Sequence, residues 1–371
     1  MIAQRMSKLD ASGIRKVFDL AASMKNPINL SIGQPDFDVP DPVKDEAIRA
    51  IREGKNRYTV TQGIPELHER LRALVNEKKG YDPDALLVTS GVSGALLLAF
   101  MALVDEGDEA LIPDPYFVMY KHLVGLCGGT PVFVNTYPDF KVTADRLREK
   151  ITSRTKLLLL NSPANPTGST VDAAELPAIA ELAAEHNLLV LSDEIYDCFS
   201  YDMPPSSIGA ACPNTLLMGG FSKSHGMTGW RLGYCAGPRE VIAAMTMLQQ
   251  YSFVCAPSFA QVAGLTALET DTSAYTEAYR RKRDLICDGL TDAGYEIRKP
   301  GGAFYVFPKA PWGTDMEFVA EAIRNNLLVI PGSVFSEKNT HFRISYAATE
   351  ETIEAGLDAL RKLIRQGPPE G

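Results

Sequence analysis

The chain has 371 residues, a hydrophobic content of 45% and a formal net charge of −9. A single hydrophobic core stops growing well below this length, so two domains are expected. The acidic balance argues against nucleic-acid and anionic-membrane partners, because both require clustered Lys and Arg. No apolar run reaches the roughly 20 residues of a membrane helix, and the N-terminus has no signal-peptide pattern. A cytoplasmic protein is therefore expected.

The cysteines and histidines do not suggest a disulfide framework or a metal site. The six cysteines include no C-x-x-C pair, and the five histidines lack H-x-x-x-H or H-E-x-x-H spacing. We expect small buried thiols in a reducing compartment and no metal. The chain also lacks G-x-G-x-x-G after a strand and the P-loop pattern, so dinucleotide and P-loop nucleotide binding lose their main support.

In chain order, nearly continuous apolar runs alternate with stretches of helical length. The run at 85–91 is followed by a helix-length segment at 94–104. Further apolar runs occupy 109–116, 156–168, 187–196, 214–223 and 231–238. Runs that are apolar throughout, rather than alternating, are typical of strands covered by helices on both faces. The pattern predicts an α/β fold with a mainly parallel sheet.

Polar residues gather just after these strands. Open α/β sheets bind ligands outside the carboxyl ends of their strands, so these side chains are expected to converge on one crevice. The residues are Ser90, Ser93, Asp114, Asn161, Asn165, Asp193, Tyr196, Ser222 and Lys223.

The C-terminal part has a different sequence pattern from the rest of the chain. A charged helix is predicted at 278–294, a strand pair broken by two glycines at 295–309, and a short strand at 340–347. We expect a smaller α+β domain that includes part of the N-terminal segment. The predicted division is a large cofactor-binding domain at 36–275 and a small domain at 1–35 and 276–371.

Lys223 and Asp193 are candidates for covalent cofactor chemistry. A lysine amine condenses with aldehydes, and pyridoxal phosphate is an aldehyde cofactor whose ring nitrogen needs a carboxylate partner. Asp193 could supply that carboxylate. The small residues at 90–96 leave free N–H groups at the entry to a helix, where a phosphate would be stabilised, and Arg231 could add a bidentate contact.

Each of these residues also has an ordinary structural interpretation. Lys223 alone could be a surface charge, and Asp193 could cap the next helix. The sequence NPTG at 165–168 is a common turn signal. Arg343 could be a solvated arginine on a strand, and Phe117 a core aromatic. The residue types alone leave these alternatives open.

Six motifs, taken together and in order, resemble a known family. They are SIGQPDF (31–37), YTVTQGIPELHERL (58–71), NSPANPTG (161–168), SDEIY (192–196), FSKSHGMTGWRLGY (221–234) and FRISYA (342–347). The set resembles the class I/II pyridoxal-phosphate-dependent aminotransferases of fold type I, especially the subgroup that contains many bacterial and archaeal aspartate aminotransferases. The similarity runs from about residue 28 to residue 360. It covers nearly the whole chain.

The resemblance implies a fold and an activity. The implied fold is a seven-stranded, mainly parallel sheet with helices on both faces plus a smaller α+β domain. The implied enzyme moves the α-amino group of an amino acid to a 2-oxo acid by a ping-pong mechanism, through an aldimine between a lysine and pyridoxal 5'-phosphate. The small-molecule substrates would be an aspartate/2-oxoglutarate-like pair or a broader set of amino donors. The sequence does not identify the donor.

The resemblance also assigns roles around the cofactor ring. Lys223 matches the lysine of the aldimine, and Asp193 matches the acid that contacts the pyridine nitrogen. Tyr196 and Asn165 match the pair that hydrogen-bonds the phenolic oxygen of the cofactor. Phe117 falls where the family has an aromatic ring over the pyridine.

The implied phosphate site draws on several parts of the chain. Gly91, Val92, Ser93 and Arg231 match phosphate-binding positions, although Val92 replaces a more usual glycine. Tyr58 matches a tyrosine that reaches the phosphate from the neighbouring subunit, which implies a homodimer with shared active sites.

Two further assignments concern the substrate and a departure from the family pattern. Arg343 matches the arginine that grips the substrate α-carboxylate, with Gly33 and Asn165 beside it. Relatives often carry Ser or Thr at the position of Gly220. Either one phosphate contact is absent here, or Ser222 replaces it.

Two other functions use similar residues. A carbon-sulfur lyase or an enzyme like aminocyclopropane-carboxylate synthase would share most of the site, because a fold does not fix a reaction. Aminotransferase-like domains also serve as effector sensors in transcription regulators. That alternative is disfavoured here, because fewer than thirty residues precede NLSIGQPDF (29–37), too few for a DNA-binding domain, and the chain is acidic.

Overall fold

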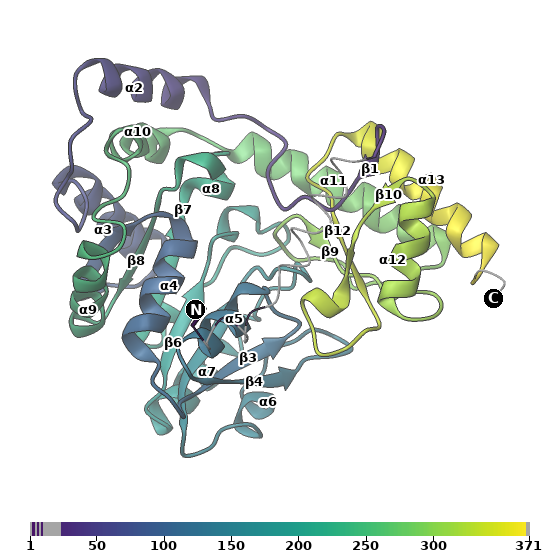
Figure 1. Ribbon diagram of the computed structural model, residues 1–371, viewed down its shortest axis with the longest axis horizontal. Coiled ribbons are helices and arrows are strands. Elements are labelled where there is room, and N and C mark those ends of the chain that lie inside the picture. Colours follow the sequence, from purple (N-terminus) through teal and green to yellow (C-terminus); the bar gives the residue numbers. More distant parts are fainter. Residues whose placement is uncertain (1, 4–5, 7–8, 10–23, 369–371) are drawn as a thin grey trace.

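The computed structural model describes residues 2–3, 6, 9 and 24–368, and its largest element is a seven-stranded sheet (Figure 1). The strand order is β2-β8-β7-β6-β5-β3-β4. Six strands run in the same direction and β8 runs opposite to them, so the predicted mainly parallel sheet is confirmed. The strands are β2 (Ala85–Thr89), β3 (Glu109–Asp114), β4 (Thr130–Asn135), β5 (Thr155–Asn161), β6 (Leu189–Asp193), β7 (Thr215–Gly220) and β8 (Gly233–Gly237).

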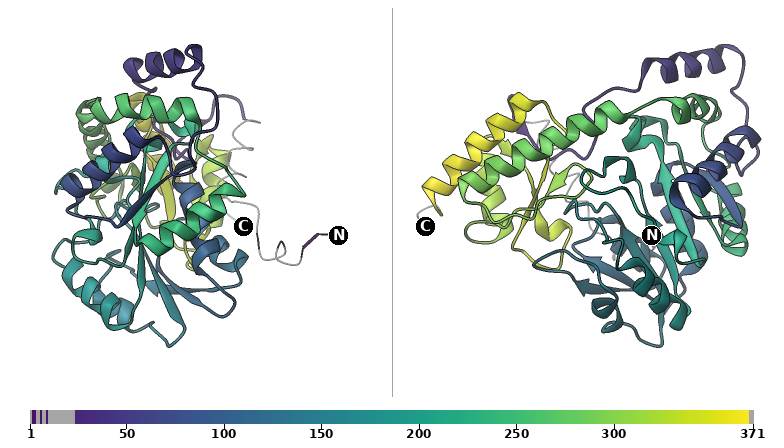
Figure 2. Two further views of the ribbon diagram at one scale, coloured as in Figure 1. Left: turned by 90° about the vertical axis from the view of Figure 1, so that its left-hand side faces the viewer. Right: turned by 180° about the vertical axis from the view of Figure 1, so that it is seen from behind.

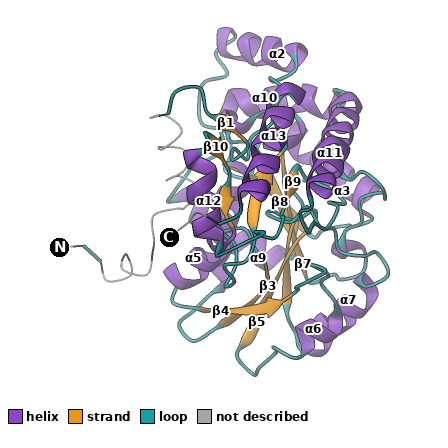
Figure 3. Cartoon of the chain, turned by 90° about the vertical axis from the view of Figure 1, so that its right-hand side faces the viewer, coloured by secondary structure: helices purple, strands orange, loops and turns teal. Residues whose placement is uncertain are grey.

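Helices cover both faces of this sheet, as Figure 3 shows. Alternate residues of β5 explain why: Leu159 packs into the core beneath α4, α5 and α9, whereas Leu158 packs into the core beneath α6 and α7. Both are fully or almost fully buried, which accounts for the continuous apolar runs. The helices of this part are α2 (Asp41–Arg52), α3 (Pro65–Lys79), α4 (Gly91–Leu103), α5 (Met119–Leu126), α6 (Ala144–Arg148), α7 (Leu176–Glu185), α8 (Phe221–Ser224), α9 (Arg239–Gln250) and α10 (Ser258–Glu269).

The C-terminal part forms two small sheets against three helices. The strand β1 (Ile28–Asn29) pairs with β10 (Leu327–Leu328), so a segment from early in the chain joins the C-terminal part. The long helices α11 and α13 lie side by side, as the view from behind in Figure 2 shows. The remaining elements are β9 (Tyr305–Val306), β11 (Ile330–Pro331), β12 (Phe342–Ser345), α11 (Ser273–Ala293), α12 (Asp315–Arg324) and α13 (Glu350–Gln366).

The strand pair predicted at 295–309 is wrong. This segment contains one short strand, β9, and its partner is β12. The glycines do not turn between two strands, because the Gly302 amide donates to the Gly168 carbonyl at 2.9 Å and Gly302 forms an isolated bridge with Ser200. They join this segment to loops that follow the large sheet.

One strand of the large sheet was not among the predicted runs. β4 is an edge strand that pairs only with β3, and most of its residues are partly or fully exposed. An edge strand does not need an apolar side chain at every position, so its sequence carries a weaker signal. The domain boundaries stay a prediction, and much of the segment 1–35 lies outside the described residues.

Two further expectations concern cysteines and membranes. All six cysteines are free thiols, and of these Cys212, Cys235 and Cys287 are buried whereas the other three are partly buried. Across the described ranges, no helix combines the length and the apolar character needed to cross a bilayer.

Candidate functional site

A cavity of about 340 Å³ lies where β5, β6 and β7 end and reaches across to β9 and β12. It brings together most of the residues singled out from the sequence, so the predicted crevice exists. The predicted residues that line it are Gly33, Val92, Ser93, Phe117, Asn161, Asn165, Asp193, Tyr196, Ser222, Lys223, Arg231 and Arg343.

Lys223 lies on the short helix α8, directly after β7, and its amine faces the cavity. The Nζ atom donates a hydrogen bond to the Gly33 carbonyl at 2.6 Å, a neutral partner. Burial, together with the positive charges of Arg343 and Arg231, lowers the pKa of Lys223 to about 8. A substantial fraction of this amine is therefore neutral, and so nucleophilic and basic, near neutral pH.

Asp193 is the last residue of β6, and its carboxylate is held from two sides. The Tyr120 hydroxyl donates to Oδ2 at 2.8 Å, and the Ile195 amide donates to Oδ1 at 3.2 Å. Burial raises the pKa of Asp193 to about 6, although these two hydrogen bonds oppose the rise. The carboxylate is thus ionised above about pH 6 and can pair with a cation in the cavity.

Arg343 reaches the cavity from β12 and is 1% exposed. Its Nη1 donates to Asn165 Oδ1 at 2.9 Å, and its Nη2 donates to the Ser31 carbonyl at 2.8 Å. The guanidinium carbon lies 4.5 Å from the ring centroid of Tyr305 and 4.6 Å from that of Phe335. The Nε atom has no hydrogen-bond partner in the described residues. Burial lowers the pKa of Arg343, but a guanidinium stays charged in proteins.

Tyr196 and Asn165 lie in a hydrogen-bonded network. The hydroxyl groups of Tyr196 and Tyr305 are 2.9 Å apart. The backbone N–H of Asn165 donates to Asn161 Oδ1 at 2.8 Å, and the side-chain Nδ2 of Asn161 donates to the Asp193 backbone carbonyl at 2.9 Å. Because Asn165 Oδ1 accepts from Arg343, its side-chain NH₂ is the group left to donate to a ligand.

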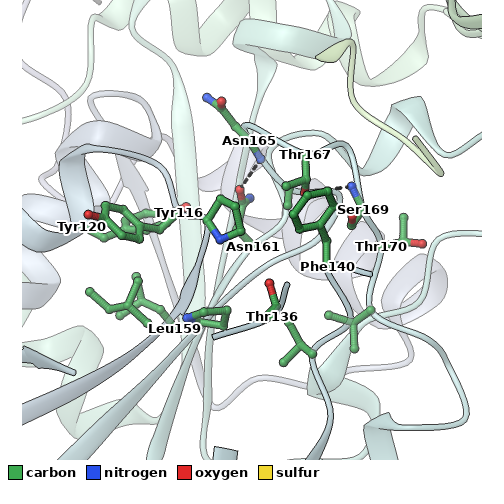
Figure 4. Close-up of a pocket in the computed structure, with 16 residues that line it drawn as sticks. Tyr116, Tyr120, Thr136, Phe140, Leu159, Asn161, Asn165, Thr167, Ser169 and Thr170 are labelled. Carbon is green, nitrogen blue, oxygen red and sulfur yellow. Dashed lines mark hydrogen bonds between the residues drawn. The ribbon is translucent and has the colours of Figure 1, made fainter. Parts of the chain in front are cut away.

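A second, smaller cavity of about 30 Å³ lies behind these residues (Figure 4). It shares Tyr120, Asn161 and Asn165 with the larger cavity. A space of this size holds no more than about two water molecules. On this side the two asparagines are joined by a hydrogen bond from the Asn165 backbone amide to Asn161 Oδ1, drawn as a dashed line.

The other end of the cavity is built to receive an anion. Helix α4 begins at Gly91 without a side-chain cap, so its first backbone N–H groups are available. Gly91 has a φ of +69°, and a Cβ atom there would lie 2.6 Å from Arg231 Nη2. Arg231 is anchored by a 2.8 Å bond from Nη1 to the Thr228 carbonyl. A glycine at position 91 thus lets the guanidinium approach the helix N-terminus.

Some predicted residues do not line the cavity. The Asp114 prediction is wrong, because this buried carboxylate accepts the Glu337 amide at 3.3 Å instead. Ser90 immediately precedes α4 and is absent from the lining, and Gly91 contributes its conformation but no side chain. Tyr58 is 83% exposed, and its role depends on a second subunit, so it stays a prediction.

Several lining residues were missed by the sequence analysis. Tyr120 and Tyr305 are the most informative, because each hydrogen-bonds a predicted site residue. The other missed residues are Ile32, Gln34, Leu96, Ile195 and Thr228. Tyr120 follows Phe117 by three positions, which is the spacing of residues on one face of a helix. A helix predicted to start near Phe117 would therefore have placed the two side chains on the same side.

Comparison with known proteins gives a consistent result. The family model described as aminotransferase class I and II matches residues 25–360. The probable aspartate aminotransferase of Methanocaldococcus jannaschii is 39% identical over 98% of this chain and 100% of its own length. Aromatic-amino-acid aminotransferase 2 of Thermococcus litoralis is 36% identical over 98% of both chains.

A solved structure has the same fold. The aspartate aminotransferase of Thermus thermophilus with maleate superposes with a TM-score of 0.94, at 37% identity, over 98% of this chain and 99% of that chain. At this similarity the agreement extends over the whole architecture and not only over the sheet.

Proposed function

The chain belongs to the class I and II aminotransferases and is an enzyme of transamination, and from that premise we propose that it binds pyridoxal 5'-phosphate through Lys223 and transfers α-amino groups to 2-oxo acids. The observation that carries this proposal is the buried pair of Lys223 and Asp193 in one cavity. One group is an amine with a lowered pKa, and the other is an acid ionised above about pH 6. When bound, the cofactor supplies an electron-withdrawing ring that stabilises the charge left by a lost substrate proton.

The residues fit this cofactor at both ends. The Asp193 carboxylate would hold the ring nitrogen in its protonated form, and Tyr120 would keep the carboxylate in place. Tyr196 and the Asn165 NH₂ group would donate to the phenolic oxygen. The free N–H groups of α4, with Arg231, Ser93 and Ser222, would hold the phosphate.

The substrate would be oriented by Arg343 and deprotonated by Lys223. A guanidinium fork fixes a carboxylate in one orientation, and Arg343 lines the cavity in which the substrate would bind. The neutral Lys223 amine would then take the proton from the substrate Cα atom. Relatives are named for aspartate and for aromatic amino acids, so we propose a donor from one of these two groups.

We also propose a homodimer that completes the site. Tyr58, Val60 and Tyr251 are 83%, 60% and 88% exposed. Tyr58 and Val60 lie on a loop that contacts the end of α9, because Gln249 Nε2 donates to the Thr61 carbonyl at 2.8 Å. Tyr251 directly follows that helix. Large exposed apolar side chains gathered on one face are typical of a protein interface. In a dimer, Tyr58 would reach the phosphate of the neighbouring subunit.

The test is a titration followed by an assay. Adding pyridoxal phosphate to the purified protein should produce a new visible absorbance, and borohydride reduction should fix the cofactor to the peptide containing Lys223, as read by mass spectrometry. A panel of amino donors with 2-oxoglutarate should then yield glutamate. Failure to bind the cofactor would reject the proposal, and release of ammonia without glutamate would indicate a lyase instead.

A further inference from the structure

Tyr305 connects two residues to which the proposed function gives separate tasks. It lies on β9, is 1% exposed, and lines the cavity. Its hydroxyl oxygen is 2.9 Å from that of Tyr196, and its ring centroid is 4.5 Å from the guanidinium carbon of Arg343. No motif in the sequence marked it.

The sheet register explains why Tyr305 meets Arg343. In the antiparallel pair of β9 and β12, Tyr305 lies opposite Ser345. Side chains two residues apart on a strand point to the same face, so Arg343 shares the face of Ser345 and lies diagonally across from Tyr305. Phe335 covers the other side of the guanidinium at 4.6 Å. The arginine is therefore held between two rings, an arrangement in which each ring attracts the cation.

The hydroxyl of Tyr305 has a direction imposed by its neighbour. A tyrosine has one O–H donor. If Tyr196 donates its proton to a ligand oxygen, then the 2.9 Å bond requires Tyr305 to donate to the Tyr196 oxygen. A hydroxyl that accepts a hydrogen bond becomes a stronger donor, because chains of hydrogen bonds polarise one another.

Gly33 leaves room for this hydroxyl. A Cβ atom at position 33 would lie 2.5 Å from the Tyr305 hydroxyl oxygen but 3.5 Å from the nearest ring carbon, which is an ordinary contact. The space beside Gly33 is therefore needed by the hydroxyl and not by the ring. The Tyr305 hydroxyl is therefore one reason why a residue without a side chain is needed at position 33.

We propose that Tyr305 is a positioning residue that serves both halves of the reaction site, its ring supporting Arg343 and its hydroxyl directing Tyr196. The proposal rests on the proposed function, because it takes Arg343 as the carboxylate-binding residue and Tyr196 as a cofactor contact. It predicts that the ring and the hydroxyl can be removed separately, with different consequences.

The first experiment compares Tyr305→Phe with Tyr305→Leu in the protein loaded with pyridoxal phosphate. Tyr305→Phe keeps the ring, so binding of the carboxylate probes maleate and 3-phenylpropanoate should stay within about twofold of wild type. Tyr305→Leu removes the ring. Its affinity for whichever probe the wild-type protein binds should be about tenfold lower than that of wild type. Equal binding by both variants would overturn the role of the ring.

The second readout is the pH at which the absorbance of the bound cofactor changes. Tyr196 faces Asp193, Arg343 and Tyr305, with the Lys223 amine 5.7 Å from its ring centroid. Weaker donation from Tyr196 leaves the cofactor oxygen less stabilised as an anion, so Tyr305→Phe should move the midpoint to higher pH. Tyr196→Phe should move it further in the same direction. An unmoved midpoint in Tyr305→Phe would overturn the role of the hydroxyl.

A matched control separates this effect from the loss of any buried hydroxyl. Tyr295 is also buried and donates to the Leu360 carbonyl at 3.0 Å, but it does not line the cavity. Tyr295→Phe should leave the midpoint and the probe binding of wild type unchanged. A midpoint shift as large as that of Tyr305→Phe would show that the effect is structural, and would overturn the proposal.

A double-mutant cycle tests the coupling to Gly33 without requiring the Leu variant to fold. Gly33→Ala should shift the midpoint upward, because the new methyl group displaces the hydroxyl. In the Tyr305→Phe background the same change should add no further shift, since the hydroxyl is already gone. Additive shifts would overturn the coupling. A wild-type protein that gains no absorbance with pyridoxal phosphate would instead reject the proposed function, so the two failures are distinguishable.

Discussion

Two buried lysines near the end of β6 show how the neighbours of an amine decide its behaviour. The side chain of Lys79, at the end of α3, is 4% exposed, lies 3.0 Å from Glu194 Oε2 and also contacts Asp197. These carboxylates raise its pKa despite burial. The Lys223 amine instead donates a hydrogen bond to a backbone carbonyl. Burial and the positive charges of Arg343 and Arg231 lower its pKa to about 8.

The difference lies in the partners and not in the depth of burial. A buried amine next to a carboxylate stays charged and becomes part of the fold. An amine that faces a neutral acceptor and positive neighbours loses its proton easily and becomes available for reaction. Asp193 and Glu194, which are consecutive in the chain, belong to these two separate environments.

The largest expected effect comes from removing the reactive amine. Lys223→Ala should reduce amino transfer to 2-oxoglutarate by about 10⁴-fold or more, because the base and the covalent anchor are lost together. Unfolding in denaturant should be nearly unchanged, since the amine is not part of an ion pair with a carboxylate that would then be left buried alone. Substantial transfer activity in this variant would contradict the role assigned to Lys223.

The structural amine should show the opposite result. Lys79→Met leaves Glu194 and Asp197 without their cation, which should lower the free energy of unfolding by about 3–5 kcal/mol. The protein that remains folded should still bind pyridoxal phosphate at Lys223. The double variant Lys79→Met with Glu194→Gln should recover part of the stability. If Lys79→Met were as stable as wild type, the comparison between the two lysines would fail.

The smallest effect is one of pH and concerns the lowered pKa of Lys223. The rate at which protein without cofactor reacts with pyridoxal phosphate should rise about tenfold for each pH unit up to about pH 8 and level off above it, because only the neutral amine reacts. An amine with an ordinary pKa would show a rise that continues well beyond this. Arg343→Met should move the plateau to higher pH, since a positive neighbour that lowers the pKa of Lys223 is removed. Stopped-flow absorbance measures both.

The sequence was sufficient for six of the seven strands of the large sheet and for much of the cavity lining. Continuous apolar runs identify strands that are buried on both faces, and the polar residues that end β5 and β6 meet because neighbouring parallel strands end at one edge. The position of Arg343 came only from the resemblance, because its strand belongs to another sheet.

The remaining features depend on contacts between distant parts of the chain. Tyr120 reaches Asp193 across 73 positions, and Tyr305 reaches Tyr196 across 109. No local period reports such a pairing. Asp114 shows the converse, because it ends a strand as Asp193 does but is two strands away in the sheet and faces the loop at Glu337 instead.

The reversed direction of β8 affects the distance between the Lys223 amine and the Arg231 guanidinium. β8 runs opposite to the other six strands, so it begins at the edge of the sheet where β7 ends, and the one connection between them carries both Lys223 and Arg231, eight positions apart. Their separation is thus fixed by one short connection. Movements of the outer helices, or insertions in other loops, should leave the span between the amine and the phosphate clamp unaltered.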